Sequence, residues 1–217
     1  MTIRILIADD HPVVRDGLRL TIERSGGDLA VIGEAADGLE VLDWARTNEA
    51  DVYVLDVTMP NLNGIDTARS LLEAHPASKV LMLSLHDTKA MVEEALAAGA
   101  RGYLTKETAT RNVVDAVSQV HAGRYYLSPS IAHFVVEAGF HFPAVEPATV
   151  RPQKLTGQER KVLQLLAEGH CNKEIATVLG ISVNTVHSHR NRVMSKLDLH
   201  KHADLVRYAI RAGLAKL

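Results

Sequence analysis

The segment VYVLDVTMP, residues 52–60, decides the fold class. Its first four residues form an apolar run rich in β-branched and aromatic side chains, which is typical of a buried strand. The carboxylate of Asp56 ends this run, and Pro60 closes the segment. A charged group at the end of a core strand needs an explanation, and the flanking sequence offers one.

Four more apolar runs of strand type occur in the N-terminal half of the chain, at residues 4–8, 30–35, 79–84 and 102–104. Amphipathic segments of helical spacing separate them, and glycine closes several of these segments, as at helix C-termini. This alternation predicts a parallel sheet, because parallel strands need crossover connections. We therefore expect an α/β fold, a five-stranded parallel sheet with helices on both faces, and a ligand site beyond the carboxyl ends of its strands.

Acidic side chains gather at that predicted edge. Asp9 and Asp10 directly follow the first strand, and Asp56 ends the third. Carboxylates at close range raise one another's pKa unless a cation lies between them. Mg²⁺ relieves this repulsion best, because it prefers carboxylate and phosphate oxygens and keeps part of its water shell. The sequence therefore predicts a magnesium site at the three aspartates.

A hydroxyl and an ammonium group should reach the same edge. Ser84 ends the fourth strand, and Lys106 follows the fifth. Beside a metal site, these two groups are what a transferred phosphoryl group needs around its equatorial oxygens. Asp56 would then act as the nucleophile and form an aspartyl phosphate.

The Asp-Asp pair at 9–10, LDVTMPNLNG at 55–64, LMLSLHD at 81–87 and GYLTK at 102–106 together resemble the receiver domain of two-component response regulators over residues 3–123. The resemblance implies a flavodoxin-like receiver with Asp56 as its phosphoacceptor. The other roles that it implies are metal binding by Asp9, Asp10, Asp56 and the backbone carbonyl of Thr58, switching by Ser84 and Tyr103, and phosphate binding by Lys106. Many receivers have proline after this lysine, whereas Glu107 follows here.

The two halves of the chain differ in charge. Residues 1–130 hold 12 Lys and Arg against 19 Asp and Glu, a net charge of −7, whereas residues 131–217 hold 12 against 7, a net charge of +5. The basic half makes nucleic acid its first candidate partner. No apolar run reaches the about 20 residues that span a bilayer, so we expect a cytoplasmic protein without a membrane segment. The single cysteine, Cys171, excludes an intramolecular disulfide and a multi-cysteine zinc site.

Three prolines between residues 143 and 152 predict a linker over residues 125–153, with room for one short helix near its start. The rest of the chain, residues 154–217, reads as a small all-α unit of four helices. The first has Thr156 and Glu159 in capping-box spacing, and the second begins at an Asn172 cap and stops at Gly180. A third helix begins at Ser182, so the second and third form a helix-turn-helix pattern.

The helix from Ser182 carries an apolar stripe that should face the core and a polar face that fits a DNA major groove. On the polar face, base edges are the expected partners of His187, Ser188 and Asn191, and phosphates are those of the basic side chains. The same face is also compatible with an ordinary solvated helix surface. The residues expected to contact DNA are Asn184, Thr185, His187, Ser188, His189, Arg190, Asn191, Arg192 and Lys196.

Residues 154–217 are similar to the LuxR-type helix-turn-helix domain, most specifically in NKEIA at 172–176, LGIS at 179–182 and the pattern TV..H at 185–189. Together with the receiver-like half, the whole chain resembles response regulators of the NarL/FixJ class. The resemblance implies a receiver domain at 1–124 and a DNA-binding domain at 154–217. Many relatives have lysine in place of His187 and serine in place of Cys171.

The implied function is that of a transcription regulator and not of an enzyme, apart from its own phosphorylation and dephosphorylation. A partner histidine kinase would phosphorylate Asp56 in a Mg²⁺-dependent step, which would release the DNA-binding domain and promote homodimerisation on double-stranded DNA.

Three other readings remain open at this point. A haloacid dehalogenase-type phosphatase also forms an aspartyl phosphate, but it has a second aspartate two residues after the nucleophile, where this chain has Thr58. A phosphorylation-independent regulator would keep the receiver fold without its chemistry. A signalling protein that does not bind DNA would show no salt-dependent affinity for duplexes.

Overall fold

A computed structural model describes residues 2–85, 88–131, 155–197, 199 and 201–216. The chain forms two compact units, an N-terminal α/β unit and a C-terminal helical unit, and each is described by itself.

The N-terminal unit is built on a parallel sheet. Its strands are β1 (Ile3–Ala8), β2 (Leu29–Ala35), β3 (Val52–Asp56), β4 (Lys79–Ser84), β5 (Gly102–Thr105) and β6 (Tyr126–Leu127), in the order β2-β1-β3-β4-β5-β6. The five strands predicted from the sequence are confirmed. The predicted strand number is wrong, because β6 adds a sixth strand beside β5 within the described residues. Two residues are too short a run to show strand periodicity.

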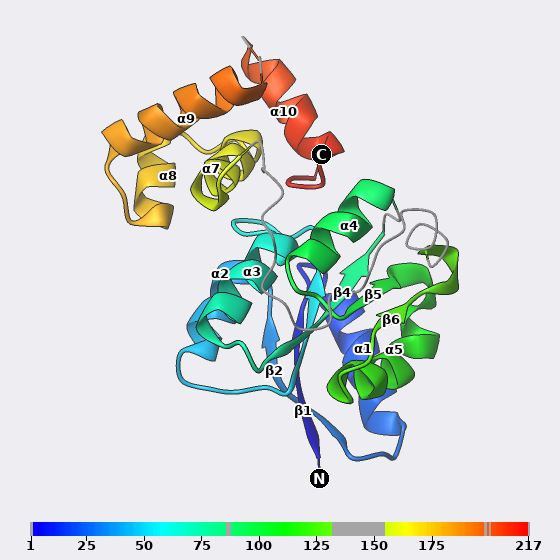
Figure 1. Cartoon of the computed structure of the whole chain (residues 1–217). Coiled ribbons are helices and arrows are strands. Elements are labelled where there is room, and N and C mark those ends of the chain that lie inside the picture. Colours follow the sequence, from blue (N-terminus) through cyan, green and yellow to red (C-terminus); the bar gives the residue numbers. More distant parts are fainter. Residues whose placement is uncertain (1, 86–87, 132–154, 198, 200, 217) are drawn as a thin grey trace. The chain divides into compact units, whose positions relative to one another are not determined.

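Helices cover both faces of the sheet. On one face lie α1 (Pro12–Arg24) and α5 (Lys106–His121), and on the other lie α2 (Gly38–Ala45), α3 (Gly64–Ala74) and α4 (Lys89–Ala97) (Figure 1). Because successive side chains of a strand point to opposite faces, each strand feeds both layers of core. Val52 and Val54 of β3 pack toward α1 and α5, whereas Tyr53 and Leu55 pack toward the other layer. Burial on both faces explains the uninterrupted apolar run at 52–55.

The linker predicted over residues 125–153 begins with β6. Residues 129–131 that follow are helical, and Ile131 is fully buried. The remainder of the predicted linker, from residue 132, lies outside the described residues.

The C-terminal unit consists of α7 (Gly157–Ala167), α8 (Asn172–Leu179), α9 (Val183–Leu197) and α10 (His202–Arg211) around its own apolar core. The predicted capping box of Thr156 and Glu159 is confirmed at the start of α7. Cys171, not Asn172, is the N-cap of α8, because its backbone amide is the one that donates to the Glu174 carboxylate. None of the helices in the described parts of the chain combines the length and apolarity that crossing a membrane requires.

Candidate functional site

Three of the predicted acids lie together at the carboxyl edge of the sheet. β1 and β3 are neighbours, so Asp9, just after β1, comes beside Asp56, the last residue of β3. Both side chains are almost fully buried, whereas the Asp10 side chain keeps 24% of its accessible surface. Two buried carboxylates at this range need a cation.

The Lys106 ammonium supplies that cation in the structure. Its Nζ lies 2.5 Å from Asp9 Oδ2 and 2.8 Å from Asp56 Oδ2, so one ammonium bridges two carboxylates from different strands. Lys106 begins α5 directly after β5, and its side chain is 7% exposed. The predicted convergence of Lys106 with Asp9 and Asp56 is therefore confirmed by geometry.

Asp10 makes a contact that sequence reasoning missed. The Nδ1 atom of His11 lies 2.8 Å from Asp10 Oδ1 and 3.2 Å from Asp9 Oδ1, and the His11 amide donates to Asp9 Oδ1 at 2.9 Å. His11 also serves as the N-cap residue of α1. The signal that could have revealed the contact is its position next to the acid pair.

The ligand atoms at this edge suit a divalent cation. Asp9, Asp10, His11 and Asp56 each offer one ligand atom, and these atoms lie within 4.8 Å of one another. Three of the four are carboxylate oxygens, which are the ligands that Mg²⁺ prefers. The residues present therefore fit the predicted Mg²⁺.

The loop after Asp56 is held close to the strand end. The Thr58 amide donates to Asp56 Oδ1 at 3.3 Å, and the Gly64 amide donates to the Val57 carbonyl at 2.9 Å. A Cβ atom at position 64 would lie only 2.0 Å from the Asp56 carbonyl oxygen. Only glycine allows this approach. Gly64 is part of the motif at 55–64, but the spacing of the motif alone does not show that position 64 must be glycine.

The two predicted switch residues lie on neighbouring strands. Ser84 ends β4, one residue beyond the position that pairs with Asp56, and is 1% exposed. Tyr103 lies on β5 and pairs with Met82 on one side and with Leu127 of β6 on the other. The Tyr103 side chain is fully buried. Ser84 thus reaches the predicted edge, whereas Tyr103 belongs to the core layer beneath α4.

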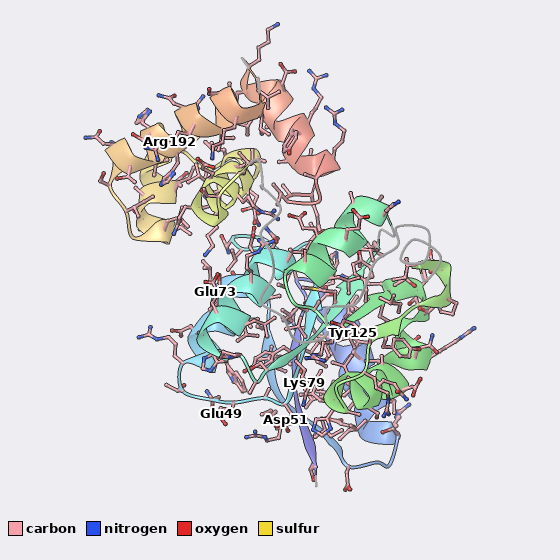
Figure 2. All side chains as sticks on the ribbon, viewed as in Figure 1. Glu49, Asp51, Glu73, Lys79, Tyr125 and Arg192 are labelled. Atoms are coloured by element: carbon pink, nitrogen blue, oxygen red, sulfur yellow. The ribbon has the colours of Figure 1, made fainter. Side chains whose placement is uncertain are left out.

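The polar face predicted for α9 is largely confirmed. Val186 and Val193 are fully buried, and Leu197 packs against the same core. The exposed residues among those expected to contact DNA are Asn184, Thr185, His187, Ser188, Asn191, Arg192 and Lys196. Arg192 projects outward from the helix (Figure 2). His189 and Arg190 are only half exposed, and His189 Nδ1 is buried.

Lys196 has a partner inside the same unit. Its Nζ lies 2.7 Å from Oε2 of Glu159, whose side chain is 3% exposed. Burial alone would raise the pKa of Glu159, but hydrogen bonds from Lys196 and Thr156 outweigh it and hold that pKa below its ordinary value. This ion pair joins α9 to α7, so Lys196 is less available to a phosphate than its sequence position suggests.

His187 also has a neighbour, Asn172 at the start of α8. The Asn172 Nδ2 atom lies 3.1 Å from His187 Nε2 and 3.5 Å from Nδ1. Similar distances to both ring nitrogens place the amide over the ring and not in its plane. The contact therefore orients the imidazole and leaves its in-plane edge to other partners.

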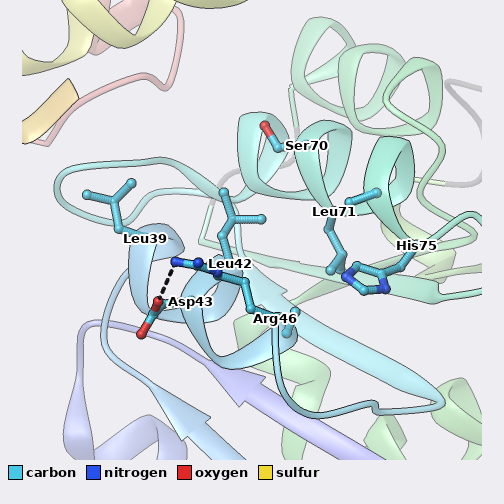
Figure 3. Close-up of a pocket in the computed structure, with 9 residues that line it drawn as sticks. Leu39, Leu42, Asp43, Arg46, Ser70, Leu71 and His75 are labelled. Atoms are coloured by element: carbon cyan, nitrogen blue, oxygen red, sulfur yellow. Dashed lines mark ion pairs between the residues drawn. The ribbon is translucent and has the colours of Figure 1, made fainter. Parts of the chain in front are cut away.

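A further pocket lies between α2 and α3 (Figure 3). Leu39, Leu42 and Leu71 line it, with the Arg46–Asp43 ion pair (3.5 Å) and His75 at its border. None of its lining residues belongs to the acidic cluster at the carboxyl edge of the sheet.

Comparisons with known proteins agree with this geometry. Residues 5–118 match the family model for the response regulator receiver domain, and residues 153–209 match that for bacterial regulatory proteins of the luxR family. The chain is 33% identical to the response regulator UvrY of Escherichia coli strain K12 over 98% of this chain and 95% of that protein. It is also 33% identical to the oxygen regulatory protein NreC of Staphylococcus carnosus, over 97% and 98% of the two chains.

Among solved structures, the chain is similar to RcsB from Salmonella enterica serovar Typhimurium bound to a promoter in the presence of the phosphomimetic BeF₃⁻. The TM-score is 0.63 at 25% identity, over 96% of this chain and 98% of that one.

Proposed function

Because this chain belongs to the two-component response regulators of the NarL/FixJ class, with a receiver domain and a LuxR-type DNA-binding domain, we propose that phosphorylation of Asp56 controls its binding to double-stranded DNA. The observation that carries this proposal is the Lys106 ammonium between Asp9 and Asp56, at 2.5 and 2.8 Å. A receiver that had kept the fold and lost the chemistry would have no need to bury this set of charges.

The proposed chemistry is phosphoryl transfer to a carboxylate. An oxygen of Asp56 bonds to the phosphorus of the donor while the bond from phosphorus to the donor atom breaks, and the donor atom keeps the electron pair. That atom is a histidine nitrogen in a partner kinase or the acetate oxygen in acetyl phosphate. Lys106 then has a phosphoryl oxygen within reach in place of the Asp56 oxygen. Its ammonium group stabilises the negative charge that builds up during transfer.

The predicted Mg²⁺ site is part of the same proposal. Asp9, Asp10, Asp56 and the backbone carbonyl of Thr58 would hold Mg²⁺, which when bound offsets the negative charge of the carboxylates and of the incoming group. The chain's own residues orient the reaction: the Thr58 amide holds one Asp56 oxygen, and the close approach of Gly64 sets the loop.

The output would follow from the switch residues and α9. After transfer, the Ser84 hydroxyl donates to the phosphoryl group, Tyr103 is held in its buried position, and the surface of α4, β5 and α5 changes. We propose that this change releases the DNA-binding domain, at 154–217, from the receiver domain, at 1–124, and favours a homodimer on DNA. The structure of a similar protein, RcsB, bound to a promoter in the presence of the phosphomimetic BeF₃⁻ supports a link between the phosphorylated receiver and DNA binding.

The proposed DNA contacts are those of the exposed face of α9. His187, Ser188 and Asn191 would meet base edges, and Arg192 would meet phosphate. Asn184 and Thr185 would contact DNA near the start of the helix. Arg190 and His189, which are half exposed, would contribute at the flanks, and Lys196 would have to leave Glu159 to reach a phosphate.

The test combines chemistry and binding. Wild type and Asp56→Asn are incubated with acetyl phosphate and Mg²⁺, the phosphorylated peptide is located by mass spectrometry, and duplex affinity is measured against genomic fragments. We expect phosphate on Asp56 of the wild type only, with tighter DNA binding. Phosphate on another residue would contradict the chemistry, and an affinity for DNA that phosphorylation leaves unchanged would indicate a phosphorylation-independent regulator.

A further inference from the structure

Strand β6 brings a serine from beyond the receiver family match, which ends at residue 118, to the end of β5. Ser128 follows β6 directly, and its side chain is fully buried. The Ser128 amide donates to the Tyr103 carbonyl at 3.0 Å, and its Oγ accepts the Thr105 amide at 3.1 Å. Ser128 thus holds both ends of the tripeptide that precedes Lys106.

A small hydroxyl cluster extends this contact into α5. The Thr108 Oγ1 lies 2.9 Å from Thr105 Oγ1 and 3.3 Å from Ser128 Oγ. Thr108 Oγ1 also donates to the Thr105 carbonyl at 3.2 Å. Three hydroxyls from β5, α5 and the segment after β6 therefore meet at the point where the chain turns from strand to helix.

Lys106 is the next residue at that turn. Thr105 is the N-cap residue of α5, yet its side chain does not cap the helix by a hydrogen bond, so the orientation of the first turn depends on other contacts. The Thr105 amide is buried, and an unpaired buried amide is strongly unfavourable. Ser128 Oγ satisfies it, and the same bond fixes the backbone from which the Lys106 side chain extends to Asp9 and Asp56.

We propose that Ser128 is a positioning residue for Lys106 in the phosphorylation of Asp56, and that β6 is in this way part of the receiver's phosphorylation site. The inference rests on the proposed function. Ser128 is not one of the aspartate, lysine or switch positions of the receiver motifs.

The same contacts connect the phosphorylation site to the segment that follows β6. Ile131, three residues beyond Ser128, is fully buried in the same core cluster as Tyr103. Tyr103 in turn pairs with Leu127 of β6. A shift of β5 when the phosphoryl group arrives must therefore move Ser128 and Ile131 or break their contacts, which couples phosphorylation to the segment that leads toward the DNA-binding domain.

The experiment uses the full chain and measures the rate constant for phosphorylation of Asp56 by acetyl phosphate with saturating Mg²⁺. We expect Ser128→Ala to lower this rate constant about tenfold, as a lost hydrogen bond at a positioned backbone would. Ser118→Ala is the matched control, because that hydroxyl donates to the Val114 carbonyl within α5. Its rate constant should stay within about twofold of the wild type.

A double-mutant cycle separates positioning from a general structural role. If Ser128 acts through Lys106, then Ser128→Ala should lower the rate by no more than about twofold in a Lys106→Met background. An equal loss in both backgrounds, or a Ser128→Ala rate equal to that of the wild type, would overturn the inference. Should Ser128→Ala fail to fold by circular dichroism, the isosteric Thr108→Val takes its place and must slow the reaction only when Lys106 is present. A wild type without phosphate on Asp56 would instead count against the proposed function.

Discussion

Replacing Lys106 by methionine should destabilise the N-terminal unit while keeping the volume of the side chain. The substitution leaves the Asp9 and Asp56 carboxylates without the ammonium that lies 2.5 and 2.8 Å from them. Removing one partner of a buried ion pair costs about 3–5 kcal/mol. We expect the lower end, about 3 kcal/mol, because the partly exposed Asp10 side chain marks a route for water to the site.

The chain contains a reporter suited to this measurement. Trp44 is its only tryptophan, and its ring packs edge-on against Tyr53 in the N-terminal unit, with 6.3 Å between ring centroids. Urea unfolding followed by Trp44 fluorescence therefore reports on that unit alone. With a slope of about 2 kcal/mol per molar urea, the loss should lower the midpoint by about 1.5 M.

Mg²⁺ should offset much of this loss. A ligand that binds only the folded state raises its stability, and a divalent cation restores the positive charge that the Lys106→Met variant lacks. Millimolar Mg²⁺ should thus raise the midpoint of the variant more than that of the wild type. Lys79→Met is the control, because Lys79 begins β4 at the opposite edge of the sheet (Figure 2). A Lys106→Met midpoint equal to that of the control, or an equal response to Mg²⁺ in variant and wild type, would refute the reasoning.

Three further substitutions have outcomes that the structure predicts. Glu159→Gln should lower the stability of the C-terminal unit by about 1–2 kcal/mol at neutral pH, since its ion-pair partner is partly exposed. Because the pKa of Glu159 is lowered in the fold, its contribution to stability is complete above the ordinary pKa of 4.5 and is lost as the pH falls through the lowered pKa. The thermal unfolding midpoints of wild type and variant should therefore converge in acid. Arg192→Ala should weaken binding to all duplexes alike and reduce the log–log salt slope by about 1, whereas a changed sequence preference would contradict a phosphate contact. Gly64→Ala should displace the Asp56 carbonyl, which a Cβ would approach to 2.0 Å, and abolish phosphorylation; Gly17→Ala, with open space around it, should be phosphorylated normally.

The sheet and most of the acidic site could be predicted because each rests on a strong local signal. Buried strands read as apolar runs, and the ends of parallel strands must share one edge, so Asp9 and Asp56 had to converge once the strands were placed. The polar face of α9 followed from the periodicity of its two buried valines in the same way.

The features that the sequence did not predict depend on contacts between segments that are separate in the chain. β6 is two residues long, and only its position beside β5 makes it a strand. The Lys196–Glu159 ion pair spans 37 residues and requires the packing of α9 on α7, which no local pattern encodes. Asn172 over His187 is a contact of the same kind between α8 and α9. The N-cap of α8 also lies one residue before the predicted Asn172, because cysteine is an uncommon cap residue and the cap depends on the bond from the Cys171 amide to the Glu174 carboxylate.

The sixth strand has a practical consequence for building chimeric sensors. A hybrid that joins this receiver to a foreign output domain at residue 124 would remove a strand, the buried Ser128 and a core side chain, Ile131. It would expose the backbone edge of β5 to solvent and to other chains. We expect such hybrids to aggregate or to respond poorly, and we expect fusion points beyond residue 131 to preserve signalling.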